Sequence, residues 1–426
     1  MSVVMHYEKI VLPNGLRVIL APMKEAETVT VLITTATGSR YETKKEGGLS
    51  HFLEHMFFKG TKKRPTALSI SEELDAVGGE YNAFTSKDRT AYYAKVDKKH
   101  AEMALDIVSD IFLNSTLPAE EIDRERGPIL QELNMYEDTP VRHVGDVFEM
   151  LLYGEHPLGR DIIGTRENIK SFKRSEFIRY LNRAYVASNV VVGIAGNFDA
   201  TWAKEIIERS FADMRTGKNP ERKKITEKQK APAVLLQSKK TDQTHFILGV
   251  RTFDFFHADR YTLAVLSTIL GGGMSSRLFM AVRERRGLAY SVHTGTDAYH
   301  DAGYLSTQCG VEHGNLEKTI AVILEEYKRI ATEVVPEKEL LKAKEHIKGS
   351  MAMHLESSDD IVGYLVDQEV LKGEIVLPEN RYAKIDAVTS ADVRRVAEMI
   401  FRSDRLNLAI IGPQKSAKKL EKMLTL

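Results

Sequence analysis

Residues 169–196 read IKSFKRSEFIRYLNRAYVASNVVVGIAG, and they align without gaps on residues 385–412, IDAVTSADVRRVAEMIFRSDRLNLAIIG. We call the shift that carries Ile169 onto Ile385 the repeat offset. Each stretch has the pattern of a capped amphipathic helix, a short turn and an apolar strand that ends at glycine. Other matched pairs are Phe177 with Val393 and Gly196 with Gly412. This pattern predicts a fold built from two copies of one helix-and-strand unit.

A second pair of segments has the same offset. TVTVLITTA at 28–36 aligns on THFILGVRT at 244–252, and both have the composition of strands. Two generic units can match by coincidence, but one offset at two distant places favours duplication. We therefore predict an α+β fold of two duplicated domains, each a mainly antiparallel β-sheet packed with helices.

A polar, Lys-rich segment lies between the copies. Residues 217–232, GKNPERKKITEKQKAP, are typical of an exposed linker. A chain of 426 residues is also longer than one ordinary hydrophobic core supports. We predict an N-terminal domain over 1–216, a linker over 217–232, and a homologous C-terminal domain over 233–426.

The composition excludes some classes of protein. Lys plus Arg and Asp plus Glu both total 60, a net charge of +0 that argues against a general nucleic-acid binder. The single cysteine, Cys309, cannot form an intrachain disulfide and is predicted to be a buried strand residue.

The first residues lack the features of a signal or transit peptide. YEKIVL and LRVILAP instead flank Asn14 and Gly15, which predicts a β-hairpin. No apolar run reaches the roughly 18 residues that suggest a membrane span. We expect a cytoplasmic protein with no membrane or nucleic-acid partner.

Three titratable side chains interrupt the apolar segment 50–60, SHFLEHMFFKG. The segment is predicted to be helical, with Ser50 helping to cap it. His51, Glu54 and His55 then fall on one face. Two histidines four residues apart can direct ring nitrogens at one zinc ion, and a glutamate between them can take a proton from water. This order, His-x-x-Glu-His, reverses the commoner His-Glu-x-x-His of zinc proteases.

The second copy lacks these side chains. The repeat offset aligns His51, Glu54 and His55 with Ser267, Leu270 and Gly271. A polar cluster in only one of two duplicated units is typical of a site added to a scaffold. From the residues alone, two surface histidines on an amphipathic helix remain the alternative.

A catalytic zinc also needs a third protein ligand. Residues 120–138, EEIDRERGPILQELNMYED, predict a second helix, on which Glu125 and Glu132 share a face. Glu132 could complete a His, His, Glu set, with Glu125 one or two turns away. Gly127 and Pro128 are expected to distort the helix between them. Spacing alone does not single out Glu132, so a solvated glutamate remains the alternative.

The sequence resembles the pitrilysin family of zinc metallopeptidases, which includes the insulin-degrading enzyme and the mitochondrial processing peptidase. The family signature is His-x-x-Glu-His, a spacer of fixed length and then Glu, and the segment 56–131 between His55 and Glu132 matches that length. Blocks similar to those of the family continue along the chain, among them GGEYNAFTSKDRTAYY, LQELNMYEDTP, HPLGRDIIGTRENI and SSRLFMAVRERRGLAYSV. The resemblance implies one Zn²⁺ per chain, held by His51, His55 and Glu132. It also implies that Glu54 is the catalytic base and Glu125 an additional active-site carboxylate.

The resemblance implies further site residues. Arg283 and Tyr290 in VRERRGLAY match an Arg–Tyr pair that can hold a substrate carbonyl and steady an oxyanion. Without the resemblance, we would interpret Arg283 as a helix-surface cation and Tyr290 as a core residue. EYNAFTSKDRTAYY alternates like a strand, and the resemblance makes it an edge strand that pairs with an extended substrate. Asn82 and Ala83 are the expected contacts.

With two domains, the chain resembles the short, processing-peptidase-like branch, in which each chain is one half of a clamshell-shaped chamber. Because the zinc motif and the Arg–Tyr pair occur in one chain, the resemblance implies a homodimer. Arg283 and Tyr290 of one subunit would then face the zinc of the other. The expected function is hydrolysis of short or unfolded, extended peptides. A presequence-processing protease of narrow specificity and a non-proteolytic scaffold subunit remain the alternatives.

Overall fold

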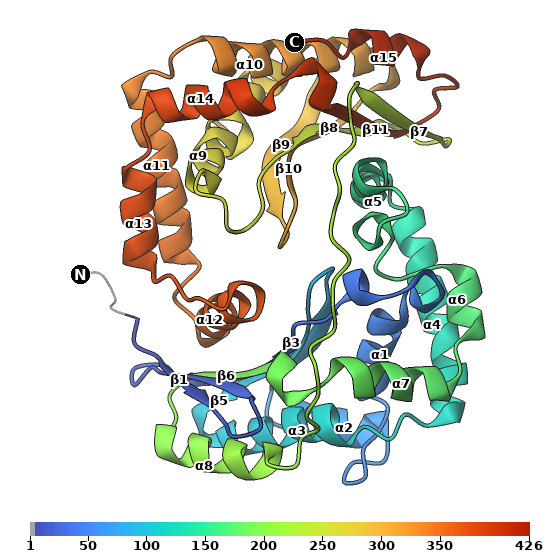
Figure 1. Cartoon of the computed structure of the whole chain (residues 1–426), viewed down its shortest axis with the longest axis vertical. Coiled ribbons are helices and arrows are strands. Elements are labelled where there is room, and N and C mark those ends of the chain that lie inside the picture. The colour runs from blue at the N-terminus through green and yellow to red at the C-terminus, as the bar shows by residue number, and fades with distance from the viewer. Residues whose placement is uncertain (1–4) are drawn as a thin grey trace. The chain divides into compact units, whose positions relative to one another are not determined.

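A computed structural model describes residues 5–426 of the chain (Figure 1). The contacts divide the chain into two compact units. Unit 1 contains the chain up to Leu133, with Arg160–Lys223 and Ala352–Leu377. Unit 2 contains Asn134–Gly159, Lys224–Met351 and Pro378–Leu426. Each unit is an α+β structure with its own sheet, which confirms the predicted fold class.

The sheet of unit 1 has six strands within the described residues, in the order β1-β2-β6-β3-β5-β4. Only β2 and β6 pair in parallel. The strands are β1 (Glu8–Val11), β2 (Arg17–Pro22), β3 (Thr28–Thr35), β4 (Glu80–Thr85), β5 (Thr90–Asp97) and β6 (Val190–Gly196). The predicted hairpin at Asn14 and Gly15 is confirmed: β1 and β2 are antiparallel, and Gly15 turns the chain with a φ of 89°.

Helices cover this sheet and carry most of the polar residues singled out above. They are α1 (Leu49–Phe57), α2 (Ala67–Asp75), α3 (Ala101–Asn114), most of α4 (Ala119–Glu137), α6 (Arg166–Ser171), α7 (Arg174–Ala184), α8 (Ala200–Phe211) and α12 (Ser358–Lys372). Helix α3 packs on β3 and β5, and α12 packs on β3 and β6. The sheet is therefore buried between elements from distant parts of the chain.

Unit 2 has a five-stranded sheet within the described residues, in the order β7-β11-β8-β10-β9. Its strands are β7 (Ala233–Ser238), β8 (Thr244–Arg251), β9 (Ala289–Ala298), β10 (Gly303–Val311) and β11 (Leu406–Gly412). Its helices are α5 (Pro140–Tyr153), α9 (Arg260–Gly271), η6 (Phe279–Glu284, a π-helix), α10 (Leu316–Thr332), α11 (Glu337–Met353), α13 (Pro378–Asp386), α14 (Ser390–Ile400) and α15 (Lys418–Met423). As predicted, Cys309 is buried, in β10.

The repeat offset relates whole elements of the two units. It carries α7 onto α14, β6 onto β11 and β3 onto β8 with both ends of each element in register. The strands also occupy equivalent places, because β3 and β8 each lie next to the matching strand β6 or β11. The structure therefore has the duplicated architecture that the sequence predicted.

Each unit contains one α-helix from the other half of the chain, as Figure 1 shows by colour for α12. Helix α12 belongs to the second half of the chain but packs on the sheet of unit 1, where Val362 and Val366 fill the space left by Gly193 of β6. Its buried Glu369 accepts hydrogen bonds from Lys9 and Arg17. A buried charge is tolerated only when it is paired, so these contacts fix α12 in place.

Helix α5 makes the reverse exchange. It belongs to the first half of the chain but packs on β8 and β11 in unit 2, with Phe148 against Gly249. Each unit is thus built from three separate segments of the chain. The predicted domain boundaries at 216 and 233 divide the chain by its sequence repeat, and they stay a prediction. The main crossing from unit 1 to unit 2, after Lys223, falls inside the predicted linker 217–232.

Candidate metal and active site

The helix that carries the two histidines begins at a tightly packed glycine. Gly48 has a φ of 96°, and a Cβ there would lie 2.4 Å from the carbonyl oxygen of Ile163. The backbone N–H groups of Gly48 and Ser50 donate to the carboxylate of Glu42, at 2.9 and 2.6 Å. The prediction that Ser50 caps the helix is wrong: Ser50 lies inside α1, and its hydroxyl bonds to that of Tyr180. The carboxylate of Glu42, six residues before Gly48, caps α1 instead.

Glu42 is an unusual cap because it is buried, with 4% of its surface exposed. Burial raises the pKa of Glu42 to about 7, although the hydrogen bonds from Ser50 and Gly48 oppose the rise. The N-terminus of the histidine helix therefore rests on a carboxyl group that titrates near neutral pH.

Helix α1 has the predicted amphipathic form. Leu49, Phe52, Leu53 and Met56 are fully buried. His51 is buried with 9% exposure, and His55 is partly exposed. The apolar side holds the helix in the core of unit 1, so the imidazoles have little freedom to move.

His51, His55 and Glu132 converge, as predicted. In each histidine, Nε2 lies 3.5 Å from Oε2 of Glu132. The three ligand atoms lie within 4.8 Å of one another. Glu132 reaches this position from α4, which continues as one helix across Pro128, so the expected distortion does not break it. Two turns of α4 therefore separate Glu132 from Glu125, on one face.

The donor set suits a cation. Nδ1 of His55 hydrogen-bonds to Glu125 at 3.0 Å, so a neutral His55 would carry its proton there and turn the lone pair of Nε2 toward Glu132. The positive charge that this contact needs can be a proton on His55 or a bound metal cation. Contact with the two histidines lowers the pKa of Glu132 to about 2. Burial lowers the pKa of His55, but hydrogen bonds to Glu125 and Glu132 outweigh it and raise the value to about 9. Two imidazoles and a carboxylate are ligands that zinc prefers.

Glu54 lies beside this set and points to a strand. Its carboxylate accepts a hydrogen bond of 2.6 Å from the hydroxyl of Thr85, the last residue of β4. Burial raises the pKa of Glu54, and the bond from Thr85 opposes that rise. A raised pKa suits a group that must accept a proton and then return it near neutral pH. Sequence reasoning missed Thr85, although it lies in the block that contains Asn82 and Ala83.

Glu125 holds His55 from the side away from the other ligands. Besides His55, it contacts Nζ of Lys59 at 2.5 Å. Burial raises the pKa of Glu125, but the bonds from His55 and Lys59 outweigh it and lower the pKa overall. Glu125 is thus a charged partner that orients the ring of His55. His51 has no such partner within residues 5–426, where its buried Nδ1 makes no hydrogen bond. Lys59 was missed, although its place four residues after His55 was a usable signal.

Family models match most of this chain. The Insulinase (Peptidase family M16) model matches residues 17–166, and the Peptidase M16 inactive domain model matches residues 171–347. An uncharacterised zinc protease of Mycobacterium leprae is 36% identical over 97% of this chain and 93% of its own length. The uncharacterised zinc protease YmxG of Bacillus subtilis is 37% identical over 94% of this chain and 97% of its own. The chain belongs to peptidase family M16.

Solved structures agree with the M16 fold. A protease from Helicobacter pylori has a TM-score of 0.88 and 24% identity, covering 96% of this chain and all of its own. A structure from Pseudomonas fluorescens, described as a peptidase M16 inactive domain, has a TM-score of 0.85 and 21% identity, covering 97% of this chain and 99% of its own. At these identities the likeness concerns the fold alone.

The Arg–Tyr pair of this M16 chain lies in unit 2. The guanidinium of Arg283, in η6, lies 4.8 Å from the ring centroid of Tyr290, in β9. It lies equally far from the ring of Phe279. Tyr290 is 80% exposed, so the alternative of a core tyrosine is wrong. An exposed phenol beside a guanidinium is available to a substrate, and its role stays a prediction.

Asn82 and Ala83 lie in β4, which is the last strand of the unit 1 sheet within the described residues. This confirms the edge position of Asn82 and Ala83, but the prediction of one strand over 80–93 is wrong: the segment turns after Thr85, and β5 lies inside the sheet between β3 and β4. The pair is opposite Tyr93 and Tyr92 of β5, and the side-chain oxygen of Asn82 accepts from the N–H of Ala83. The open side of β4 can pair with an extended chain. No helix among residues 5–426 has both the length and the apolar character needed to cross a membrane.

Proposed function

We propose that this M16 member is a zinc-dependent endopeptidase that hydrolyses short or unfolded, extended peptides. The observation that carries the proposal is the convergence of His51, His55 and Glu132 beside Glu54. Glu54 in turn touches Thr85 at the end of the edge strand β4. A metal set, a proton acceptor and a peptide-pairing edge therefore adjoin one another in unit 1.

The proposed chemistry needs only a few groups. Zinc, when held by His51, His55 and Glu132, acts as a Lewis acid that polarises a carbonyl and makes water more acidic. Glu54 takes the proton from the attacking water and passes it to the leaving amine. The hydroxyl of Thr85 holds the Glu54 carboxylate in place, and Glu125 fixes the ring of His55.

The proposed substrate follows from β4. Main-chain hydrogen bonds along Asn82 and Ala83 would bind any extended segment, with little dependence on its side chains. We also propose a cytoplasmic homodimer in which Arg283 and Tyr290 of one subunit act on the peptide bound to the zinc domain of the other. The rivals are a processing protease with a narrow cleavage rule and a non-proteolytic scaffold. An intact donor set with its own proton acceptor favours an active enzyme over a scaffold.

The proposal is tested by zinc content and peptide cleavage in wild type and in Glu54→Gln. We expect about one zinc per chain in both proteins, and a loss of cleavage of at least about a hundredfold in the variant. Glu72→Gln, on the exposed side of α2, is the matched control and should cleave like wild type. Zinc binding without cleavage that depends on Glu54 would favour the scaffold. Mass spectrometry of products from an unbiased peptide library separates a narrow processing rule from broad cleavage.

A further inference from the structure

A polar cavity in unit 1 shares no residue with the candidate metal site. It has a volume of about 330 Å³ and lies between the end of α3, helix α7 and the segment that follows α8. Phe112, Leu181, Tyr185 and Met214 supply its apolar side chains, Asn114, Ser210 and Asp213 supply polar groups, and Arg215 supplies a cation. An adjoining lobe of about 120 Å³ shares Phe112, Leu181 and Arg215 with it. The volume of the main cavity, about 330 Å³, is at the lower end of the range that small-molecule sites occupy.

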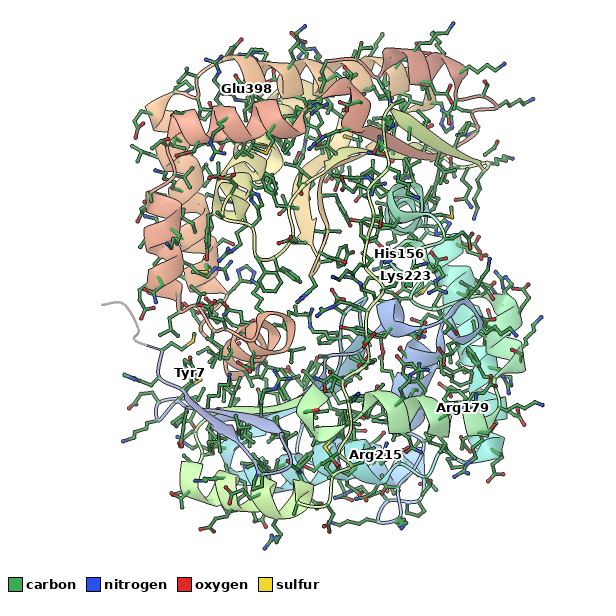
Figure 2. All side chains as sticks on the ribbon, viewed as in Figure 1. Tyr7, His156, Arg179, Arg215, Lys223 and Glu398 are labelled. Carbon is green, nitrogen blue, oxygen red and sulfur yellow. The ribbon has the colours of Figure 1, made fainter. Side chains whose placement is uncertain are left out.

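Arg215, labelled in Figure 2, makes no ion pair or side-chain hydrogen bond within residues 5–426. Its Nη1 is buried, and burial is the cause that lowers its pKa. The side chain as a whole is half-buried, and a buried guanidinium nitrogen without a hydrogen-bond partner is costly. Arg174, which lines the adjoining lobe, is already engaged, because it donates to the carbonyl oxygens of Leu117 and Thr116. Arg215 is therefore the cation left for a ligand.

The walls of the cavity are held firmly. The rings of Phe112 and Tyr185 pack on Phe57 in the core, with centroids 5.9 and 5.6 Å away. The carbonyl oxygen of Arg215 accepts from the N–H of Ala187 at 2.9 Å, which ties its backbone to the corner after α7. Leu117, which lines the adjoining lobe, has a φ of 47°, a conformation that costs energy in a non-glycine residue. The site is thus formed before any ligand arrives.

We propose that this cavity binds a small organic carboxylate, with the carboxylate on Arg215 and the hydrocarbon part against Phe112, Leu181, Tyr185 and Met214. The planar guanidinium matches a carboxylate with two parallel hydrogen bonds. The apolar walls favour a ligand with a hydrocarbon part over a bare inorganic anion. Asp213, an exposed lining residue, repels any anion, and it repels a doubly charged phosphate more than a singly charged carboxylate.

Fluorine NMR of the full chain with 4-fluorobenzoate tests the proposal, with 4-fluorobenzamide as the uncharged match. We expect saturable binding of the carboxylate and at least about tenfold weaker binding of the amide. Arg215→Gln should weaken binding of the carboxylate by a similar factor. Arg179→Gln, which removes an exposed arginine of α7 that Figure 2 also labels, should bind like wild type.

Leu181→Trp is a second variant that keeps Arg215 but fills the cavity, and it should also lose binding. Thermal unfolding of each variant shows whether it is folded. Equal binding of carboxylate and amide, or unchanged binding by folded Arg215→Gln or Leu181→Trp, would overturn the proposal. So would tighter binding of inorganic phosphate than of 4-fluorobenzoate. None of these readings depends on peptide cleavage, so they are independent of the proposed enzymatic function.

Discussion

Helices α1 and α9 hold equivalent places in the repeat but differ in the side chains on their matching faces. In α1 the face carries His51, Glu54 and His55, whereas α9 carries Ser267, Leu270 and Gly271. In unit 2 that face is closed by β9. A Cβ at Gly271 would lie 2.4 Å from Oγ1 of Thr294, and the hydroxyl of Ser267 donates to the carbonyl oxygen of Thr294. Duplication supplied two similar scaffolds, and of these two helices α1 alone carries titratable side chains on this face.

Helix α4, which supplies Glu125 and Glu132, differs from its counterpart α11 in the same way. The repeat offset carries Glu132 of α4 onto Lys348 of α11, and Glu125 onto Leu341. Lys348 contacts Asp386 at 2.8 Å, and Leu341 is 49% exposed. Unit 2 thus lacks every counterpart of the donor set, so it serves as an internal control for the role of these side chains.

The largest expected effect comes from replacing Glu132 of unit 1 with lysine, the residue at the matching position 348 of unit 2. Glu132→Lys should abolish zinc binding, because it replaces a carboxylate ligand with a cation next to the two histidines. Cleavage should fall to the level of the metal-free protein. Atomic absorption and a peptide assay measure both. The reverse change, Lys348→Glu, should create no metal site, since α9 has no histidine. Zinc retained at wild-type affinity in Glu132→Lys would break the comparison.

Glu42 caps α1, but the repeat offset places Ala258 at the matching position of unit 2. The pKa of Glu42 rises from 4.5 to about 7 on folding. Its contribution to stability is therefore full below about pH 4.5 and is lost as the pH rises through 7. Between pH 5 and pH 8, wild type should lose about 2–3 kcal/mol more unfolding free energy than Glu42→Gln. Denaturant unfolding at both pH values measures the difference; parallel pH profiles would contradict it.

Glu125 orients His55, so its loss should weaken the metal site without removing a ligand. Glu125→Gln should lower zinc affinity about 10- to 100-fold, as loss of such outer partners does in other metal sites. Competition with a chelator measures this affinity. Glu120→Gln, exposed on the same helix, is the control and should not change it. Unchanged affinity in Glu125→Gln would assign Glu125 a purely structural role.

A substitution at Gly271 tests whether β9 packs closely against α9. Gly271→Ala should destabilise the protein by about 1–3 kcal/mol, because its Cβ would press on the backbone and side chain of Thr294. Gly349→Ala in α11, where nothing lies within 4 Å of the added Cβ, should be neutral or slightly stabilising. Denaturant unfolding compares the two. Equal stability of both variants would show that β9 can move away and that the face is not closed.

Much of this architecture could be predicted from sequence, because the repeat preserves apolar spacing. The bounds of α7, β6 and β3 recur in α14, β11 and β8 at the predicted offset. The exchange of α5 and α12 could not be predicted, since it depends on tertiary packing such as Val366 against Gly193 and not on a local pattern.

The candidate site, like the fold, could be predicted only in part. His51, Glu54 and His55 share one helix, so their spacing reveals them. Glu132 comes from another helix, and only the resemblance to a family singled it out. The contact of Thr85 with Glu54 joins segments 31 residues apart, and single-sequence patterns contain no signal for it. Glu42 lies only six residues before Gly48, but this spacing is not that of a capping box, so the usual cap pattern does not reveal it.

The central claim is that a zinc ion lies between two imidazoles of α1 and one carboxylate of α4. Anomalous diffraction at the zinc edge, from crystals of the protein grown with zinc, tests it directly. The account predicts one peak per chain about 2.0–2.2 Å from Nε2 of His51, Nε2 of His55 and a carboxylate oxygen of Glu132. A peak elsewhere, or Glu132 turned out of coordinating distance while zinc is bound, would contradict it.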